Sequence, residues 1–332
     1  MSVKPATHNF LPSAKPLTHI CQGVILQYMS LESRFDLGRS CPSILRIESS
    51  IPLTVDTLEF RSDRIKINRI LYHFEIIVSE ESCFTQITVT DLSDMSNFIT
   101  TFEGEDKIYS SSKHLIKKMF GRNVHPIRIK KFMIRVLDDS LLENLKFQVR
   151  KLRAYGNDVL RSFSKFSASN YPLEILELGK QLDSSDSCFQ LDVVKTAKLI
   201  RWDVLNYELF ATKMERVKSL SNERIMIATI GTFSDLNSLC ELAQHWASSD
   251  RTDGNSIAII ISDATSYQMW YLLQNRLGAF ITTTLNEDGD ETVNLALQME
   301  NNRLLHIYSI PLRIRKEECF FCMEVKDRID TP

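Results

Sequence analysis

Two cysteines near the carboxyl end of the chain have the spacing of a metal-binding or redox-active pair. Cys319 and Cys322 form the sequence CFFC, and thiolates at this spacing bind zinc or exchange with disulfides. A tetrahedral zinc site needs four ligands, but the chain contains no second C-x-x-C and no H-x-x-x-H. The nearest histidine, His306, falls in a predicted strand. We therefore expect no metal site, and we interpret CFFC as strand positions that alternate between buried and exposed.

The window from Lys113 to Arg135 is the most basic part of the chain. It contains no Asp or Glu, and clustered Lys and Arg side chains bind phosphate through charge-assisted hydrogen bonds. The candidate anion-binding residues are Lys117, Lys118, Arg122, Arg128, Lys130 and Lys131. The alternative, which we favour, is a solvated face of elements whose apolar residues point inward. No interleaved aromatic residues suggest base stacking, so we do not expect a nucleic-acid partner.

The common signatures of nucleotide-dependent and hydrolytic enzymes are missing. The sequence contains no G-x-G-x-x-G, no G-x-x-x-x-G-K-[ST], no G-x-S-x-G and no H-E-x-x-H, and it has only 10 glycines in 332 residues. Paired carboxylates such as Asp138 and Asp139 lie in polar breaks beside predicted strands, where hydration is the ordinary explanation. We expect no catalytic residues, no cofactor and no enzymatic activity.

Composition predicts a folded protein without a global charge preference. Its hydrophobic content is 43% and its formal net charge is -2, so any charged function is local. The seven cysteines have no framework spacing, which indicates reduced thiols. Residues 1–15 lack periodicity and are expected to be a flexible leader. No apolar run suits a signal peptide or a membrane span, so we expect a cytoplasmic or nuclear protein without a membrane partner.

Residues 16–52 have the spacing of three short helices. Ile20, Val24, Ile25 and Tyr28 form one apolar stripe of the first helix. Ser30 is a predicted N-cap of the second helix. Pro42 suits the first turn of the third helix, where a missing N–H is tolerated.

The rest of the chain predicts a mixed α+β or α/β fold. Residues 53–112 are β-rich and predict a small antiparallel sheet over 53–91, followed by a helix that ends near Gly121. Residues 113–278 alternate strands with helices, one of which begins near Ser234 and Asp235. This alternation predicts an irregular leucine-rich-repeat-like arc or an open α/β sheet. Residues 279–332 predict closing antiparallel strands and a tail.

Several blocks of the sequence resemble a known family. The run YMSLESRFDLGRSCPSILRIESSIPLTVDTLEFRSDRIKINRILYHF resembles the opening of a nematode-expanded family of uncharacterised proteins. KHLIKKMFGRNVHPIRIKKFMI, LENLKFQVRKLRAYGNDV and YPLEILEL resemble later blocks of that family in the same order. The resemblance covers most of residues 17–200 and implies organisation more than chemistry.

The first block is also similar in length and hydrophobic order to an F-box. That similarity implies binding to a Skp-type adaptor protein, as in a substrate-recognition subunit of a cullin-RING ubiquitin ligase with an unknown protein target. The residues that match its apolar positions are Leu17, Ile20, Val24, Tyr28, Leu31, Phe35, Leu37, Cys41, Leu45 and Ile47. Three alternatives stay open. These residues could pack only on the following sheet, or the chain could be a stand-alone binding module that uses the basic window 113–135 for a phosphorylated or nucleic-acid partner. The third alternative, an unrecognised hydrolase, would need a deep pocket with paired titratable groups.

Overall fold

The computed structural model describes ten stretches of the chain. They are residues 18–78, 83–102, 108–136, 145–166, 172–179, 187–204, 210–229, 235–285, 291–312 and 317–327. The expected leader, 1–15, lies outside them, as do Leu17 and Ser234.

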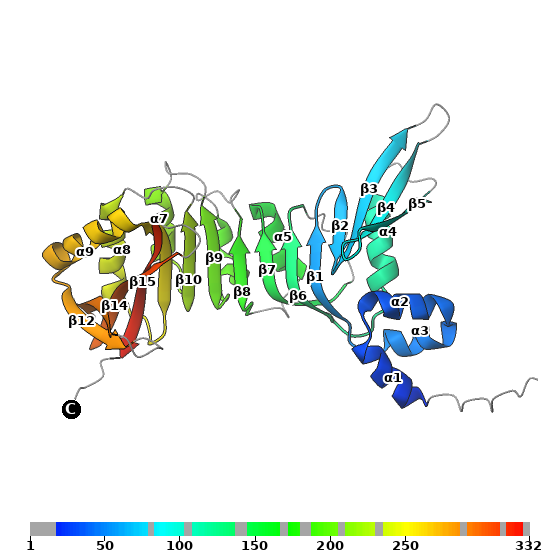
Figure 1. The fold of residues 1–332 in the computed structure, drawn as a ribbon, viewed down its shortest axis with the longest axis horizontal. Coiled ribbons are helices and arrows are strands. Elements are labelled where there is room, and N and C mark those ends of the chain that lie inside the picture. The colour runs from blue at the N-terminus through cyan, green and yellow to red at the C-terminus, as the bar shows by residue number, and fades with distance from the viewer. Residues whose placement is uncertain are drawn as a thin grey trace, which may run out of the picture.

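Three short helices open the described chain, as predicted. They are α1 (His19–Tyr28), α2 (Leu31–Ser40) and α3 (Pro42–Ser49). The Ser30 hydroxyl accepts a hydrogen bond from the Ser33 amide at 3.2 Å and caps α2. Pro42 occupies the first turn of α3. Figure 1 shows these helices beneath one end of a long sheet.

All strands of the described chain belong to one sheet of 15 strands. In spatial order from one edge to the other they run β12-β13-β14-β15-β11-β10-β9-β8-β7-β6-β1-β2-β3-β4-β5. The strands are β1 (Thr54–Phe60), β2 (Arg64–Ile67), β3 (Ile70–Val78), β4 (Cys83–Asp91), β5 (Ser96–Phe102), β6 (Ile127–Ile134), β7 (Phe147–Ala154), β8 (Ile175–Leu178), β9 (Leu199–Val204), β10 (Arg224–Thr229), β11 (Ser256–Ser262), β12 (Phe280–Leu285), β13 (Glu291–Gln298), β14 (Arg303–Pro311) and β15 (Glu318–Asp327).

The sheet is parallel in its middle and antiparallel at both ends. Strands β1 and β6 to β11 pair in parallel, and β6 to β11 are neighbours in chain order. Strands β2 to β5 extend one end, and β12 to β15 extend the other. The predicted mixed α/β class is confirmed, but the sheet is not small. Residues 53–91 join it through the parallel pairing of Leu58 with Phe132.

The helices that follow β5 pack on one face of this sheet. They are α4 (Ile108–Phe120), α5 (Asn157–Phe166), the 3₁₀ helix η3 (Ser187–Gln190), α6 (Asp192–Lys195), α7 (Phe210–Lys218), α8 (Leu236–Ala247) and α9 (Asp263–Leu277). Their buried side chains share one hydrophobic core with the strands. As predicted, α4 ends before Gly121 and Asp235 caps α8. We call the opposite face of the sheet the open face.

On six of the parallel strands, the residues buried on the helix-covered face recur with the same spacing. Each of these strands has buried side chains at positions n, n+3 and n+5, where n lies two residues before the first residue of β8, β9 and β10. The triplets are Val55/Leu58/Phe60, Ile129/Phe132/Ile134, Val149/Leu152/Ala154, Leu173/Leu176/Leu178, Ala197/Ile200/Trp202 and Asn222/Ile225/Ile227. From β6 onward the first positions, at 129, 149, 173, 197 and 222, are 20, 24, 24 and 25 residues apart. The buried pattern is thus more regular than the spacing of strands and helices in the sequence suggests.

Phe132 lies at the centre of the core beneath β6. Its side chain is fully buried, and its ring centroid lies 5.6 Å from that of Phe60, 5.9 Å from that of Phe147 and 6.2 Å from that of Phe163. These edge-on and tilted contacts join β1, β6, β7 and α5 into one packed unit.

Replacing Phe132 by Ala should destabilise the protein by about 3–5 kcal/mol, because the change removes apolar contacts and leaves a cavity. Urea unfolding followed by circular dichroism measures this loss. Phe98→Ala is the matched control, since Phe98 is 60% exposed on β5, and it should cost less than about 0.5 kcal/mol. Equal losses in the two variants would contradict the central role of Phe132.

Candidate functional site

Helix α1 exposes an apolar face. Ile20, Val24 and Tyr28 follow one another at i, i+4 and i+8 and are 78%, 48% and 88% exposed, and Ile25 beside them is 46% exposed. The other side of α1 packs on α3 through Leu26, which is fully buried. Large apolar side chains gathered on one exposed surface mark an interaction site more often than scattered ones do.

The remaining F-box-like positions lie inside the segment formed by α1, α2 and α3 (His19–Ser49), which we call the helical segment. Leu31 is buried in the main core and Phe35 packs against it, so α2 attaches the segment to the sheet. Ile47 is buried in a small separate core with Leu26 and Ile51, and Leu37 packs on that core. Cys41 and Leu45 are half-buried. The ten matched residues therefore divide into three exposed positions on α1 and six that hold the helices together, with Leu17 outside the described chain.

A buried ion pair joins α2 to α3. The Arg34 guanidinium lies 3.1 Å from a carboxylate oxygen of Glu48 and also donates to the Glu48 backbone carbonyl at 3.3 Å. Both side chains are less than a tenth exposed. Burial lowers the pKa of Arg34, and the nearby carboxylate of Glu48 opposes that shift. No local pattern predicts this pair, because its two members are 14 residues apart on different helices.

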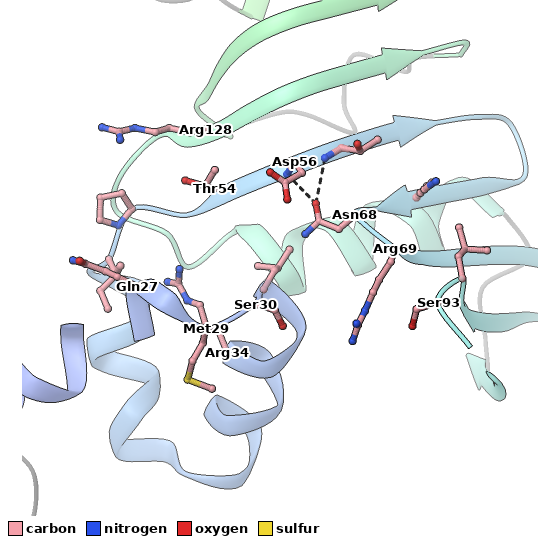
Figure 2. Close-up of a pocket in the computed structure, with 16 residues that line it drawn as sticks. Gln27, Met29, Ser30, Arg34, Thr54, Asp56, Asn68, Arg69, Ser93 and Arg128 are labelled. Carbon is pink, nitrogen blue, oxygen red and sulfur yellow. Dashed lines mark hydrogen bonds between the residues drawn. The ribbon is translucent and has the colours of Figure 1, made fainter. Parts of the chain in front are cut away.

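A pocket of about 940 Å³ lies between the helical segment and the amino ends of β1 and β6. Figure 2 shows Gln27, Met29, Ser30 and Arg34 on the helical side and the strand residues opposite them. The charged residues that line it are Arg34, Asp56, Lys66, Arg69 and Arg128. Four of these five charges are positive, so the net charge of the lining is positive.

Asn68 shapes the strand side of this pocket. It has φ +53°, a left-handed conformation that asparagine tolerates, in the tight turn between β2 and β3. Its side-chain oxygen accepts hydrogen bonds from the amides of Asp56 at 2.9 Å and Thr57 at 3.2 Å (Figure 2). The turn is thereby fixed to β1, and Lys66 and Arg69 on either side of it line the pocket.

The predicted anion-binding residues divide between the two sides of the sheet. Lys117 and Lys118 are exposed in the last turn of α4, which packs on the helix-covered face, and Arg122 follows that helix. Arg128 and Lys130 alternate with the buried Ile127 and Ile129 and so point to the open face. Of these two, Arg128 lines the pocket of Figure 2, and Lys130 pairs with Asp56 at 2.6 Å. Lys131 is half-buried. The window is not one continuous basic surface.

One region of the chain matches a known family of protein domains. Residues 107–261 match the model of a domain of unknown function, DUF3557. The match covers just under half of the chain and extends from α4 into β11, which is the part with consecutive parallel strands. No curated protein and no solved structure matches the chain.

The open face of the DUF3557 region carries a network of charges. Glu177 on β8, which is 7% exposed, lies 2.8 Å from Lys151, 3.7 Å from Arg153 and 4.0 Å from Arg201. Asp203 on β9 also pairs with Arg153, at 3.4 Å, and with Arg201, at 3.6 Å. This network was not predicted from the sequence. Register brings its members together from strands 24 or more residues apart, and no local motif marks them.

The two thiols of the CFFC sequence point to opposite faces of β15. Cys319 contributes to the main core, whereas Cys322 lies on the other side in register with Tyr308. Both are buried, so the expected exposed position is wrong, although the alternation between faces holds. Burial raises the pKa of Cys319 to about 11 and that of Cys322 to about 12. In the described stretches, no group of three or more His, Cys, Asp and Glu residues could hold a metal ion.

Within the described residues, no helix is both long and apolar enough to cross a membrane.

Glu48→Gln should destabilise the protein by about 3–5 kcal/mol, because it leaves the Arg34 charge buried without its partner. Chemical unfolding of the full chain measures the loss. The matched control is Glu174→Gln, which breaks the exposed pair between Arg150 and Glu174 and should cost no more than about 1 kcal/mol. A loss as small as that of the control would show that the Arg34 pair contributes little.

The buried His306 should make the stability of the protein depend on pH. Burial, assisted by the charge of Lys326, lowers the pKa of His306 below its usual 6.5, while Glu324 opposes the shift. The unfolded chain therefore takes up a proton at a higher pH than the folded chain does, and stability should fall as the pH drops through about 6.5. Unfolding free energies at about pH 7.5 and about pH 5.5 test this. His306→Gln should reduce the loss, and His125→Gln, which removes an exposed loop histidine, is the control. An unchanged loss in His306→Gln would contradict the assignment.

Proposed function

We propose that this chain is a non-catalytic interaction protein, and specifically an F-box-like substrate-recognition subunit of a cullin-RING ubiquitin ligase. In this proposal α1–α3 bind a Skp-type adaptor and the sheet presents a surface to a protein target. The observation that carries it is the exposed apolar face of α1, formed by Ile20, Val24, Ile25 and Tyr28. Chemistry would be supplied by the ligase partners, so the role of this chain is to bring the target close to them.

The energetics of the α1 face support a docking role. Full burial of a large apolar side chain contributes about 1.5–3 kcal/mol, so even partial burial of four such residues gives a partner a sizeable favourable term. The face is held rigidly, because Leu26 on the opposite side of α1 packs in the small core with Ile47 and Ile51. A preorganised helix face loses little conformational entropy when a partner binds.

The order of the helical segment supports the F-box resemblance. Three short helices follow one another within residues 19–49, and the matched apolar positions on α2 and α3 build their interior and their attachment to the sheet. Of these positions, Leu31 and Phe35 pack on the core shared with the sheet, which is the role in the alternative interpretation, whereas Leu37 and Ile47 pack among the helices. Only the α1 positions are left for a partner. A docking element needs both kinds of residue, because buried residues hold its helices together and exposed residues contact the partner.

The parallel region supports the presentation of a target surface. Buried triplets at n, n+3 and n+5 that recur every 20 to 25 residues are similar to the L-x-x-L-x-L core of leucine-rich repeats. Asn222 begins the last triplet and donates to the backbone carbonyls of Val194 and Ala197, both at 2.7 Å. We therefore propose a leucine-rich-repeat-like region whose open face contacts the target. A Skp-type partner would place the protein in the cytoplasm or nucleus.

The double variant Val24→Asp with Tyr28→Asp should weaken binding of a recombinant Skp-type adaptor at least about tenfold, because it places two charges in an apolar contact. Biolayer interferometry with the full chain measures this affinity. Tyr271→Asp is the matched control, because Tyr271 is 68% exposed on the surface of α9, far from α1. It should bind as wild type does.

Two outcomes would overturn the proposal. If the wild-type chain does not bind the adaptor, the F-box-like role is wrong. If the double variant binds as well as the wild type, the exposed face of α1 is not the contact surface. Circular dichroism of both variants verifies that the helices are retained, which is expected since the replaced side chains are exposed on a helix surface.

A further inference from the structure

Three arginines lie side by side at the carboxyl ends of the parallel strands. Past the last paired residues, the Arg61 amide donates to the Arg64 carbonyl at 3.0 Å, and the Arg135 amide donates to the Phe60 carbonyl at 3.0 Å. The register of β2, β1 and β6 therefore continues through Arg64, Arg61 and Arg135 in one row. Neighbouring strands are about 4.8 Å apart, so these three side chains start close together on the open face.

The row continues through an aromatic residue and a glycine. The Tyr155 amide donates to the Ile134 carbonyl at 3.2 Å, and the Gly179 amide donates to the Ala154 carbonyl at 2.7 Å. The guanidinium of Arg135 lies 4.5 Å from the centre of the Tyr155 ring, and that of Arg153 lies 5.1 Å from it. An aromatic face attracts and orients a guanidinium group. Tyr155 thus holds two arginines beside the row.

Gly179 makes room for Tyr155. A Cβ atom at position 179 would lie 2.9 Å from Tyr155 Cδ1 and 3.0 Å from Tyr155 Cα. The first distance is shorter than real Cβ contacts and the second is tight, so a larger residue at 179 would force Tyr155 to shift together with the arginines that its ring orients. Together these residues line a groove of about 900 Å³ that also includes Asp63 and Asp203. We call it the arginine groove.

Most charges in the arginine groove are already neutralised, but Arg135 is not. Arg61 pairs with Glu59, Arg64 pairs with Asp63 at 2.8 Å, and Arg153 pairs with Asp203 at 3.4 Å. Arg135 forms no ion pair with a carboxylate of the described chain. It is exposed, and it is positioned by the Tyr155 ring instead. Three of the four arginines in the lining thus have a carboxylate partner, and the local positive charge of the groove is centred on Arg135.

We propose that the arginine groove binds a phosphate monoester carried on a side chain of a protein partner. A phosphate group has three strong acceptor oxygens and about two negative charges, and arginine donates paired hydrogen bonds to it in a fixed geometry. Arg135 supplies the unpaired cation, and Arg61, Arg64 and Arg153 surround it. The groove is much larger than phosphate alone, so the residues that flank a phosphorylated side chain fit beside it.

The charge distribution favours a single phosphorylated side chain over a nucleic-acid backbone. Nucleic acids carry regularly spaced phosphates and need a continuous basic track. Here carboxylates interrupt the cations on all sides, at Glu59, Asp63, Glu177 and Asp203. These carboxylates would repel the successive phosphates of a polynucleotide, whereas a single dianion needs only Arg135, the cation of the groove that has no carboxylate partner among the described residues. This inference is independent of adaptor docking, because the groove lies past the carboxyl ends of β1 and β6, whereas α1 lies near the amino end of β1 (Figure 1).

The test uses the full chain and two pooled peptide libraries, one with a central phosphoserine, phosphothreonine or phosphotyrosine and one without phosphate. Fluorescence polarisation should show binding of the phosphorylated pool and competition by inorganic phosphate. Arg135→Gln should weaken that binding about tenfold or more, since it removes a charge-assisted contact. Arg224→Gln is the matched control, because Arg224 is an exposed arginine at the start of β10 that lines neither the arginine groove nor the pocket of Figure 2. It should leave binding within about twofold.

Each other outcome overturns part or all of the proposal. Equal binding of the two pools, or equal weakening by the two variants, would show that the groove does not recognise phosphate. Arg135-dependent binding of inorganic phosphate without any peptide binding would assign the groove to a small free phosphate. Arg135-dependent binding of a single-stranded oligonucleotide in preference to the phosphopeptides would assign it to nucleic acid.

A second variant covers the case in which Arg135→Gln unfolds. Arg135→Lys keeps the charge but loses the planar guanidinium with its paired donors, and an intermediate affinity of this variant would verify the role of the guanidinium. Val24→Asp with Tyr28→Asp should bind phosphopeptides as wild type does, which separates this result from adaptor docking.

Discussion

One-sided burial of the parallel strands is the constraint on which the rest of this structure depends. Six of these strands place three side chains, apolar except for Asn222, on the helix-covered face, and the fully buried Phe132 illustrates how tightly that face is packed. Because side chains alternate between the faces of a strand, the residue between the second and third buried positions, such as Arg153 between Leu152 and Ala154, points the other way. The open face is thus available for charged residues such as Glu177 and Arg153 without any loss of core packing.

The helical segment is attached to this sheet with little contact area. Leu31 and Phe35 connect α2 to the main core, while Leu26, Ile47 and Ile51 form a separate small core among the helices. A cluster this small gains limited stability from apolar burial, which gives the buried pair of Arg34 and Glu48 a larger share in fixing the angle between α2 and α3. The same arrangement leaves the outer side of α1 uncovered.

Local patterns predicted the elements well, whereas relations between distant elements could not be predicted. The Ser30 cap, Pro42 and the stop at Gly121 act within a few residues, so sequence shows them directly. The period of the buried triplets escaped detection, because Ala154, Trp202 and Asn222 fill core positions that a pattern of aliphatic residues does not reveal. The arginine groove escaped for another reason. Arg61, Arg135 and Tyr155 become neighbours only through strand register, and the basic window contains just one of them.

The parallel strands also fix a distance. Strand β1 has seven residues from Thr54 to Phe60, which span about 20 Å at the usual rise of a strand. One end of it adjoins the helical segment, and the other end opens into the arginine groove. Hydrogen-bonded neighbours on both sides prevent the strand from bending or extending independently. Two molecules bound at these ends would be held at a constant separation and orientation, so β1 and its neighbours act as a rigid spacer within any assembly that this protein forms.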